Sequence, residues 1–238
     1  MPSREGIPAR RLQSPSYGCG SAPESDRFPP RGSHAAIATR WLRQPSAAGW
    51  WQTTAMGRIY TKSGDDGTTG LLYGGRASKG ADLVDALGDI DEAVSALGVA
   101  RAGCEDEQRS ALILGLQRDL FVVAADLATN PAHRDRLVHG ISFVDSSMAV
   151  KIEDLIDALI LAQPLRPVFV VPGTTAQEAA IDLARSVVRR AERHTVQART
   201  AGCLVTDDVL RYLNRLSDLL YVMARHAVDG AEESASHD

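Results

Sequence analysis

The sequence predicts an all-α fold, an up-and-down bundle of about five helices preceded by a loop rich in glycine, threonine and lysine. Three observations indicate it. Apolar residues recur at helical spacing over several long segments, and proline, glycine or asparagine separates these segments. Runs with the two-residue alternation of strands are nearly absent, and nothing recurs at the period of a repeat protein.

The first two helices are predicted near 82–102 and 105–129. Each carries an apolar stripe at intervals of three or four residues, and Asn130-Pro131 ends the second helix. The stripes are Leu83, Leu87, Ile90, Val94 and Leu97 in the first helix, and Leu112, Leu116, Leu120 and Val123 in the second.

Three further helices are expected near 150–162, from Thr174-Thr175 onward, and near 206–228. Two prolines and a short extended run, 168–171, separate the third helix from the fourth. Glu178 stands three residues after Thr175, which is the spacing of a capping box. The apolar stripe of the fourth helix consists of Ala176, Ala180, Leu183, Val187 and Ala191.

The composition favours a globular chain with its own core, because 44% of the 238 residues are hydrophobic and 24% are charged. A net charge of −4 argues against non-specific attraction to nucleic acid or an anionic membrane. No stretch approaches the roughly 20 apolar residues that span a bilayer. The three cysteines lack metal-ligand spacing, so we expect a reduced, cytoplasmic protein without a protein-held metal site.

The two ends of the chain differ from its centre. Residues 1–55 are rich in proline, serine, glycine and arginine, and we expect a disordered tail there, as well as at 231–238. A start codon assigned too early, with Met56 as the true first residue, would explain the first tail. An arginine-rich mitochondrial transit segment is the alternative, and would place the protein in the matrix. The functional domain is expected at 56–230.

The loop from Tyr60 to Gly70 has the chemistry of a phosphate site. Its glycines allow backbone N–H groups to approach an anion, its hydroxyls add donors, and Lys62 adds positive charge. Lys79 offers a second cation nearby. The loop is not a Walker A motif, because the residue order differs and no strand precedes it. An ordinary flexible loop is the alternative interpretation.

Arginines line one face of the fourth helix. Arg185, Arg189 and Arg193 recur every four residues, and Arg190 adds charge beside them. Such a cluster suits bidentate binding of a polyphosphate. The alternative is a solvated face, on which Asp182 would pair with Arg185 and Glu192 with Arg189.

Polar residues also border the apolar faces of the first and fifth helices. On the fifth helix, Asn214 and Asp218 could read an adenine or ribose edge, or only form local hydrogen bonds. Asp82, Asp85, Asp89 and Glu92 of the first helix are expected to be solvated, whereas Asp91 lies at the edge of the stripe and requires a cationic partner.

Together these segments resemble the PduO-type cobalamin adenosyltransferases. The family motifs appear in order as TKSGDDGTT, GDIDEAV, PGT, RSVVRRAER and YLNRLSD, over about residues 57–228. Three positions depart from the family pattern: Thr174 replaces a glycine, Val94 an asparagine and Leu87 a common aromatic residue.

The resemblance implies a homotrimer of helical bundles with active sites between subunits. It assigns the following residues to the ATP triphosphate: Thr61, Lys62, Ser63, Gly64, Thr69, Gly70 and Lys79. The rest of the nucleotide site would be Arg189, Arg190, Glu192, Arg193 and Asn214. Asp91 and Arg185 would pair across the subunit interface, and Phe169 would displace the lower axial base of cobalamin.

The implied reaction is attack of cob(I)alamin on the 5′-carbon of ATP, which gives adenosylcobalamin and triphosphate. The departing triphosphate would be stabilised by Lys62, Lys79, Arg189 and Mg²⁺, and no protein nucleophile is needed. A reductase would supply cob(I)alamin, and an adenosylcobalamin-dependent mutase or dehydratase would receive the product. The alternatives are an ATP-binding cobalamin chaperone or regulator on the same scaffold, and a non-enzymatic bundle.

Overall fold

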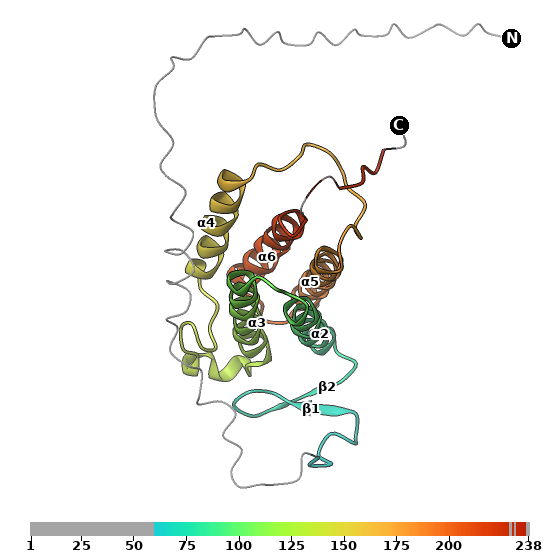
Figure 1. Ribbon diagram of the computed structural model, residues 1–238. Helices are drawn as coiled ribbons and strands as arrows, with labels where there is room; N and C mark the ends of the chain where they lie inside the picture. Colours follow the sequence, from blue (N-terminus) through green and yellow to red (C-terminus); the bar gives the residue numbers. More distant parts are fainter. Residues whose placement is uncertain (1–59, 229, 231, 237–238) are drawn as a thin grey trace, which may run out of the picture. The chain divides into compact units, whose positions relative to one another are not determined.

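The computed structural model describes residues 60–228, 230 and 232–236, and the prediction for residues 1–55 lies outside this part of the chain. The described residues form the all-α bundle that the sequence predicts, and Figure 1 shows its helices. Their bounds are Asp82–Ala102 (α2), Glu107–Ala128 (α3), Ser146–Ala162 (α4), Ala176–Thr200 (α5) and Asp207–Arg225 (α6), with a 3-10 helix at Pro131–Arg136 (η1).

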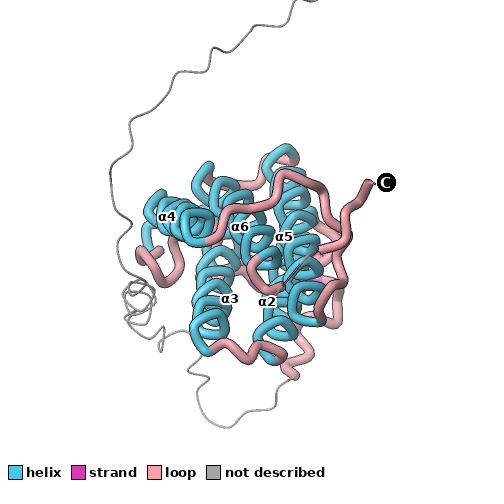
Figure 2. Tube along the Cα trace, turned by 45° about the horizontal axis from the view of Figure 1, so that its top comes forward, coloured by secondary structure: helices cyan, strands magenta, loops and turns pink. Residues whose placement is uncertain are grey.

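The helices pack as antiparallel neighbours around one core. α2 lies between α3 and α5, α5 also packs against α6, and α4 covers the outer side of α6, as Figures 1 and 2 show. The apolar faces meet in a single cluster, so most helical stability comes from this packing. Its large, fully buried members include Ile90, Leu97, Leu116, Leu120, Ile152, Ile181, Leu213 and Leu216.

Capping side chains set the helix starts. Asp106 accepts hydrogen bonds from two backbone N–H groups at the start of α3, and Thr175 accepts one from Glu178 at the start of α5. Asp145 caps α4 in the same way, so α4 begins four residues before the expected Val150. The capping prediction at Thr175 is confirmed.

A small antiparallel sheet precedes the bundle. Strands Thr68–Gly70 (β1) and Arg76–Ser78 (β2) pair with Thr69 opposite Ala77. Strands of three residues leave no alternation to read in the sequence, which is why the hairpin was not predicted. Its turn is fixed to the end of α3, because the Leu72 N–H bonds the carbonyl of Ala128 at 2.8 Å.

Two expectations about helix faces are wrong. Leu183 of the predicted α5 stripe is 58% exposed, whereas Val187 and Ala191 are buried as predicted, together with Ile181, Ala184 and Val188. The side chain of Asp89 is only 13% exposed, because it is covered by α5 and not solvated. No helix within the described residues is long and apolar enough to cross a membrane.

Candidate functional site

Hydrogen bonds within the hairpin hold the glycine- and threonine-rich loop in one shape. Lys79 Nζ donates to the carbonyl of Gly64 at 2.8 Å, and the hydroxyls of Thr61 and Ser63 lie 2.7 Å apart. Lys62 is exposed and has a φ of 61°, in the left-handed region that a side chain rarely adopts. The loop therefore presents a defined backbone and an exposed lysine at the end of the bundle.

Arg76 and Asp66 organise this loop, and sequence reasoning missed both. Arg76 Nε donates to Thr68 Oγ1 at 2.7 Å, and its guanidinium also reaches the carbonyl of Ser63 and the Asp66 carboxylate. Hydrogen bonds from the Thr68 side chain and backbone, helped by Arg76, lower the pKa of Asp66. No spacing in the sequence distinguishes these residues from their neighbours.

Thr69 and Gly70, also predicted for the triphosphate, belong to β1. Their backbones pair with Ala77 and Arg76 of β2, so their positions are fixed by the sheet. An added Cβ at Gly70 would meet no heavy atom within 4 Å, so this glycine leaves open space at the end of the strand.

The arginines of α5 differ in their surroundings. Arg189 and Arg193 are exposed, and Arg193 Nη1 donates to the Arg189 carbonyl at 3.0 Å. Arg190 turns to α2, where its Nε lies 3.0 Å from Asp89 and its Nη2 meets Glu92. The two exposed arginines are therefore available to an anion, whereas Arg190 already has two carboxylate partners.

Residues from α5 and α6 that the sequence assigned to the nucleotide come together. Asn214 Nδ2 donates to Glu192 Oε1 at 3.1 Å, although 22 residues separate them. Arg215 donates to Asn214 Oδ1 at 2.8 Å, which orients the amide. The amide and the carboxylate thus form one polar pair beside Arg189 and Arg193 on α5.

The direction of α5 places Arg189 and Arg193 in the half of the helix that is nearer to the hairpin. Gln197, near the end of α5, donates to Asp82 at the start of α2 at 2.8 Å, and Gln177, at the start of α5, bonds the carbonyl of Ala100 at 3.0 Å. The two helices are therefore antiparallel, and the hairpin leads directly into α2. Among the described residues, no hydrogen bond or ion pair joins the hairpin to Arg189.

Phe169 lies at the opposite end. It is in the α4–α5 loop, which Figure 1 shows at the far end of the bundle from β1 and β2, and it is 85% exposed. Arg189 is 13 residues beyond Ala176 at the start of α5, a rise of about 20 Å along the helix. A single chain does not bring Phe169 to the hairpin.

The predicted pair of Asp91 and Arg185 does not form within the chain. Asp91 is exposed on α2 and forms no ion pair with any of the residues that the structure describes. Arg185 Nε lies 2.8 Å from Asp182 on its own helix, which is the alternative partner that the sequence offered. The guanidinium also lies 5.8 Å from the centre of the Tyr221 ring.

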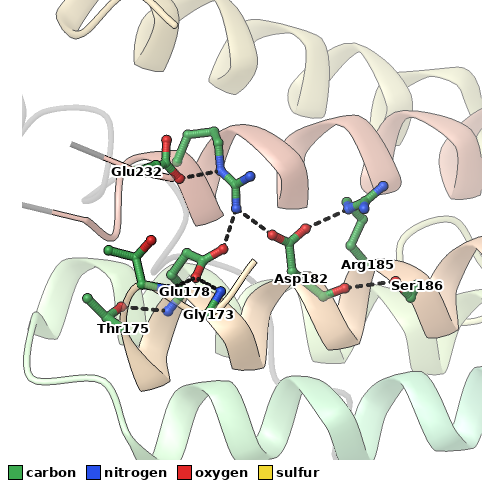
Figure 3. A network of polar contacts seen from close by, with 9 residues as sticks. Gly173, Thr175, Glu178, Asp182, Arg185, Ser186 and Glu232 are labelled. Atoms are coloured by element: carbon green, nitrogen blue, oxygen red, sulfur yellow. Dashed lines mark hydrogen bonds and ion pairs between the residues drawn. The ribbon is translucent and has the colours of Figure 1, made fainter. Parts of the chain in front are cut away.

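A buried ionic cluster lies near the start of α5, and the sequence analysis missed it. Figure 3 shows Glu178 and Asp182 of α5 and Glu232 of the C-terminal segment around one guanidinium, that of Arg225 at the end of α6. Two acidic residues four apart on a mostly apolar face could have indicated it. The arginine partner could not be identified, because it is more than 40 residues away.

The fold is a helical bundle with an anchored glycine-rich loop before its first helix and two exposed arginines on α5, neither of which forms an ion pair with a described carboxylate. The model of the family "Cobalamin adenosyltransferase" matches residues 59–227, which is most of the chain. The chain belongs to the cobalamin adenosyltransferase family, and the predicted resemblance is confirmed.

Individual relatives agree. The chain is 40% identical to the corrinoid adenosyltransferase of Mycobacterium tuberculosis over 178 residues, which cover 71% of this chain and 88% of that protein. It is 36% identical to corrinoid adenosyltransferase PduO of Salmonella typhimurium over 183 residues, or 75% of this chain and 51% of that protein.

Solved structures show the same fold. A phenylalanine-to-alanine variant of the PduO-type ATP:corrinoid adenosyltransferase from Lactobacillus reuteri, complexed with cobalamin and ATP, superposes with a TM-score of 0.65 at 32% identity. The match covers 71% of this chain and 93% of that chain. An arginine-to-lysine variant of that protein, complexed with ATP, gives a TM-score of 0.62 at the same identity.

Proposed function

We propose that this protein transfers the 5′-deoxyadenosyl group of ATP to cob(I)alamin, giving adenosylcobalamin and triphosphate. The observation that carries the proposal is the exposure of Arg189 and Arg193 in the half of α5 that is nearer to the hairpin, in a chain of the cobalamin adenosyltransferase family. Exposed guanidinium groups on a rigid helix suit bidentate binding of phosphate.

In this proposal the hairpin holds the triphosphate. Backbone N–H groups and hydroxyls of Thr61, Ser63, Gly64, Thr69 and Gly70 would donate to phosphate oxygens, with Lys62 and Lys79 as cations. Lys79 already bonds the Gly64 carbonyl at 2.8 Å, so it could stabilise the loop and the phosphate together. The paired Glu192 and Asn214 would contact the nucleoside.

The chemistry requires positioning and charge more than a protein nucleophile. Cob(I)alamin, a substrate, supplies the electron pair that forms the cobalt–carbon bond, while the bond from the 5′-carbon to the triphosphate oxygen breaks. Negative charge grows on that oxygen, so Arg189 and Lys79 would lower the barrier electrostatically.

Mg²⁺ would accompany the triphosphate, since this ion is commonly held by phosphate oxygens and one or two carboxylates. Among the residues predicted for the nucleotide, Glu192 is the one with a carboxylate, and its hydrogen-bond partner Asn214 is neutral. Glu192 would therefore supply one carboxylate contact to Mg²⁺. The ion would neutralise charge on the leaving group.

We further propose a homotrimer in which a neighbouring subunit completes each site. This accounts for Phe169 and the hairpin lying at opposite ends of one chain, and for Asp91 having no cationic partner among the described residues. Asp91 would pair with Arg185 of the next subunit. A reductase would supply the substrate in the cytoplasm, or in the matrix if residues 1–55 are a transit segment, and a mutase or dehydratase would take the product.

The test is anaerobic incubation of the protein with ATP, Mg²⁺ and cob(I)alamin, followed by absorbance spectroscopy. We expect a light-sensitive alkylcobalamin and one triphosphate for each corrinoid consumed. Binding of ATP and corrinoid without product would instead identify a chaperone or regulator on the same scaffold. If ATP fails even to raise the melting temperature, the nucleotide site itself is wrong.

Phe169→Ala separates the corrinoid step from ATP binding. The side chain is exposed, so its removal should leave the fold and the ATP-induced thermal shift intact. Turnover should fall, and bound cob(II)alamin should lose its four-coordinate spectrum, because no aromatic group displaces the lower base. Val168→Ala is the matched control in the same loop. A four-coordinate spectrum that persists in Phe169→Ala would transfer this role to another side chain.

A further inference from the structure

The loop that carries Phe169 gets little support from side-chain packing. It runs from Gln163 to Thr175 between α4 and α5, and the apolar side chains of Val168, Phe169 and Val171 are all exposed. A loop with so little buried apolar surface is held in one conformation only if its backbone is bonded elsewhere. Its hydrogen-bond partners are therefore informative.

Those partners lie in the C-terminal segment. The Ala235 N–H donates to the Phe169 carbonyl at 2.8 Å, and the Val171 N–H donates to the Glu233 carbonyl at 2.9 Å. Val170 and Ser234 form the antiparallel bridge between these two bonds. The C-terminal segment thus pairs like a strand with Phe169 and the two residues that follow it, a contact that the expected disorder of 231–238 did not include.

Arg225 anchors this C-terminal segment to the bundle. Its Nε lies 2.9 Å from Glu232, immediately before the paired residues, and both side chains are almost fully buried. Arg166, from the same loop as Phe169, donates to the Glu232 carbonyl at 3.1 Å. Because this ion pair is removed from water, loss of either partner would leave an uncompensated buried charge, so Glu232 ties the start of the C-terminal segment to α6.

The same guanidinium also holds the other end of the loop. Arg225 Nη2 lies 2.5 Å from one oxygen of the fully buried Glu178. The second Glu178 oxygen accepts hydrogen bonds from the backbone N–H groups of Gly173 and Thr174, at 2.7 and 3.0 Å. Figure 3 shows Glu178 between the guanidinium and Gly173 of the loop. Two carboxylates bound to a single arginine therefore hold the loop from both sides of Phe169.

We propose that Arg225 is a positioning residue for the corrinoid-facing loop, acting through Glu232 and Glu178 and touching neither substrate. The proposal rests on the proposed function, since it takes Phe169 as the side chain that meets the corrinoid. Backbone pairing with the C-terminal segment holds Phe169 in position. Arg225 in turn holds the C-terminal segment in place through its ion pair with Glu232.

Glu232→Gln in the full chain is the sharpest test. The substitution keeps the size of the side chain and removes its charge, while Arg225 retains Glu178 and Asp182, so the bundle should stay folded. Glu233→Gln is the matched control, because this neighbouring side chain is exposed and forms no hydrogen bond or ion pair in the described part of the chain. Hydrogen exchange of the Val171 and Ala235 amides and steady-state kinetics are measured for both variants.

We expect Glu232→Gln to accelerate exchange at both amides by about tenfold, because the buried ion pair that ties Glu232 to Arg225 is lost. The KM for the corrinoid should rise and the fraction of four-coordinate cob(II)alamin should fall, with the KM for ATP unchanged. Glu233→Gln should resemble the unmodified protein in all four measurements.

Two results would overturn the inference. Unchanged exchange at Val171 and Ala235 would mean that Glu232 does not anchor the segment. Faster exchange with an unchanged corrinoid KM and spectrum would mean that the anchor is structural only. Failure of the proposed function is distinguishable, because the unmodified protein would then form no alkylcobalamin although the exchange experiment would still report on the anchor.

Discussion

At the scale of single residues, the arginines differ in whether a carboxylate of the same chain already pairs with them. Arg189 and Arg193 are exposed, whereas Arg190 and Arg225 are held by carboxylates of other segments. Neighbours one position apart on α5 thus have different tasks. Sequence spacing predicted a basic face, but it could not show which of its arginines are already paired.

Arg189→Ala should impair catalysis far more than folding. The side chain is exposed, so little packing is lost, whereas an arginine on the departing triphosphate contributes about 2–4 kcal/mol to transition-state stabilisation. Initial rates and urea unfolding are measured together, with Arg118→Ala, an exposed arginine of α3, as control. A variant with near-normal turnover, or one that does not fold, would contradict the assigned role.

The buried Asp119 makes stability depend on pH. Desolvation raises its pKa from 3.8 to about 6, although Tyr212 and Lys151 act in the opposite direction. The folded state therefore binds more protons than the unfolded state between these values, and the free energy of unfolding falls as pH rises through this range. Above about pH 6 the full cost of the buried charge is present.

Asp119→Asn should consequently stabilise the protein at about pH 8 by about 2–3 kcal/mol and have little effect near pH 4. The neutral amide can still pair with the Tyr212 hydroxyl, 3.3 Å away in the unmodified protein. Denaturation at both pH values measures the difference, and Asp154→Asn on the exposed face of α4 is the control. Equal stabilisation at the two pH values would exclude titration of Asp119 as the cause.

At the scale of elements, local signals in the sequence located the helices well. Thr175, for example, caps α5 as its spacing to Glu178 predicted. Elements that depend on distant partners could not be predicted in this way. The hairpin has strands too short to show a pattern, and the Arg225 cluster joins α5, α6 and the C-terminal segment, which only folding brings together.

Gly75→Ala should displace the hairpin. Gly75 has a φ of 85°, and an added Cβ would lie 3.0 Å from Asn130 Nδ2, at the point where the turn meets the end of α3. The left-handed conformation alone costs about 1–2 kcal/mol for a residue with a side chain. The thermal shift produced by ATP should shrink, while the helical circular dichroism stays unchanged.

Gly80→Ala is the matched control, because an added Cβ there comes no closer than 3.9 Å to Ser78 Oγ and the backbone is not left-handed. An equal loss of the ATP-induced shift in both variants would show that hairpin placement is not what Gly75 provides.

At the scale of the whole molecule, the proposed trimer would give Asp91 the cationic partner that it lacks among the described residues of one chain. Asp91→Ala should weaken assembly, measured by light scattering after size-exclusion chromatography, because a partly buried partner would lose its counter-charge at a cost of about 3–5 kcal/mol. Asp85→Ala, another exposed aspartate of α2, should leave the mass unchanged.

Arg185→Ala completes the assembly experiment. Arg185 also pairs with Asp182 inside the chain, but Asp182 keeps Arg225 when Arg185 is removed. The double variant should therefore lose less than the sum of the two single losses. Strictly additive losses would mean that Asp91 and Arg185 do not meet, and the proposed interface would have to be abandoned.

The antiparallel pairing of α2 with α5 also has a consequence for synthesis on the ribosome. It joins residues far apart in the chain: Arg190 bonds Asp89 across 101 positions, and Gln197 bonds Asp82 across 115. The part of α2 that packs against α5 must therefore wait for that helix, which begins 74 residues after Ala102.

At ordinary elongation rates this delay lasts about 4–15 s. During that time α3 can cover its own part of α2, while the part that packs against α5 stays exposed on the nascent chain. Stalled or prematurely released chains that end before α5 should therefore aggregate, and the growing chain is a substrate for chaperones until α5 has left the exit tunnel.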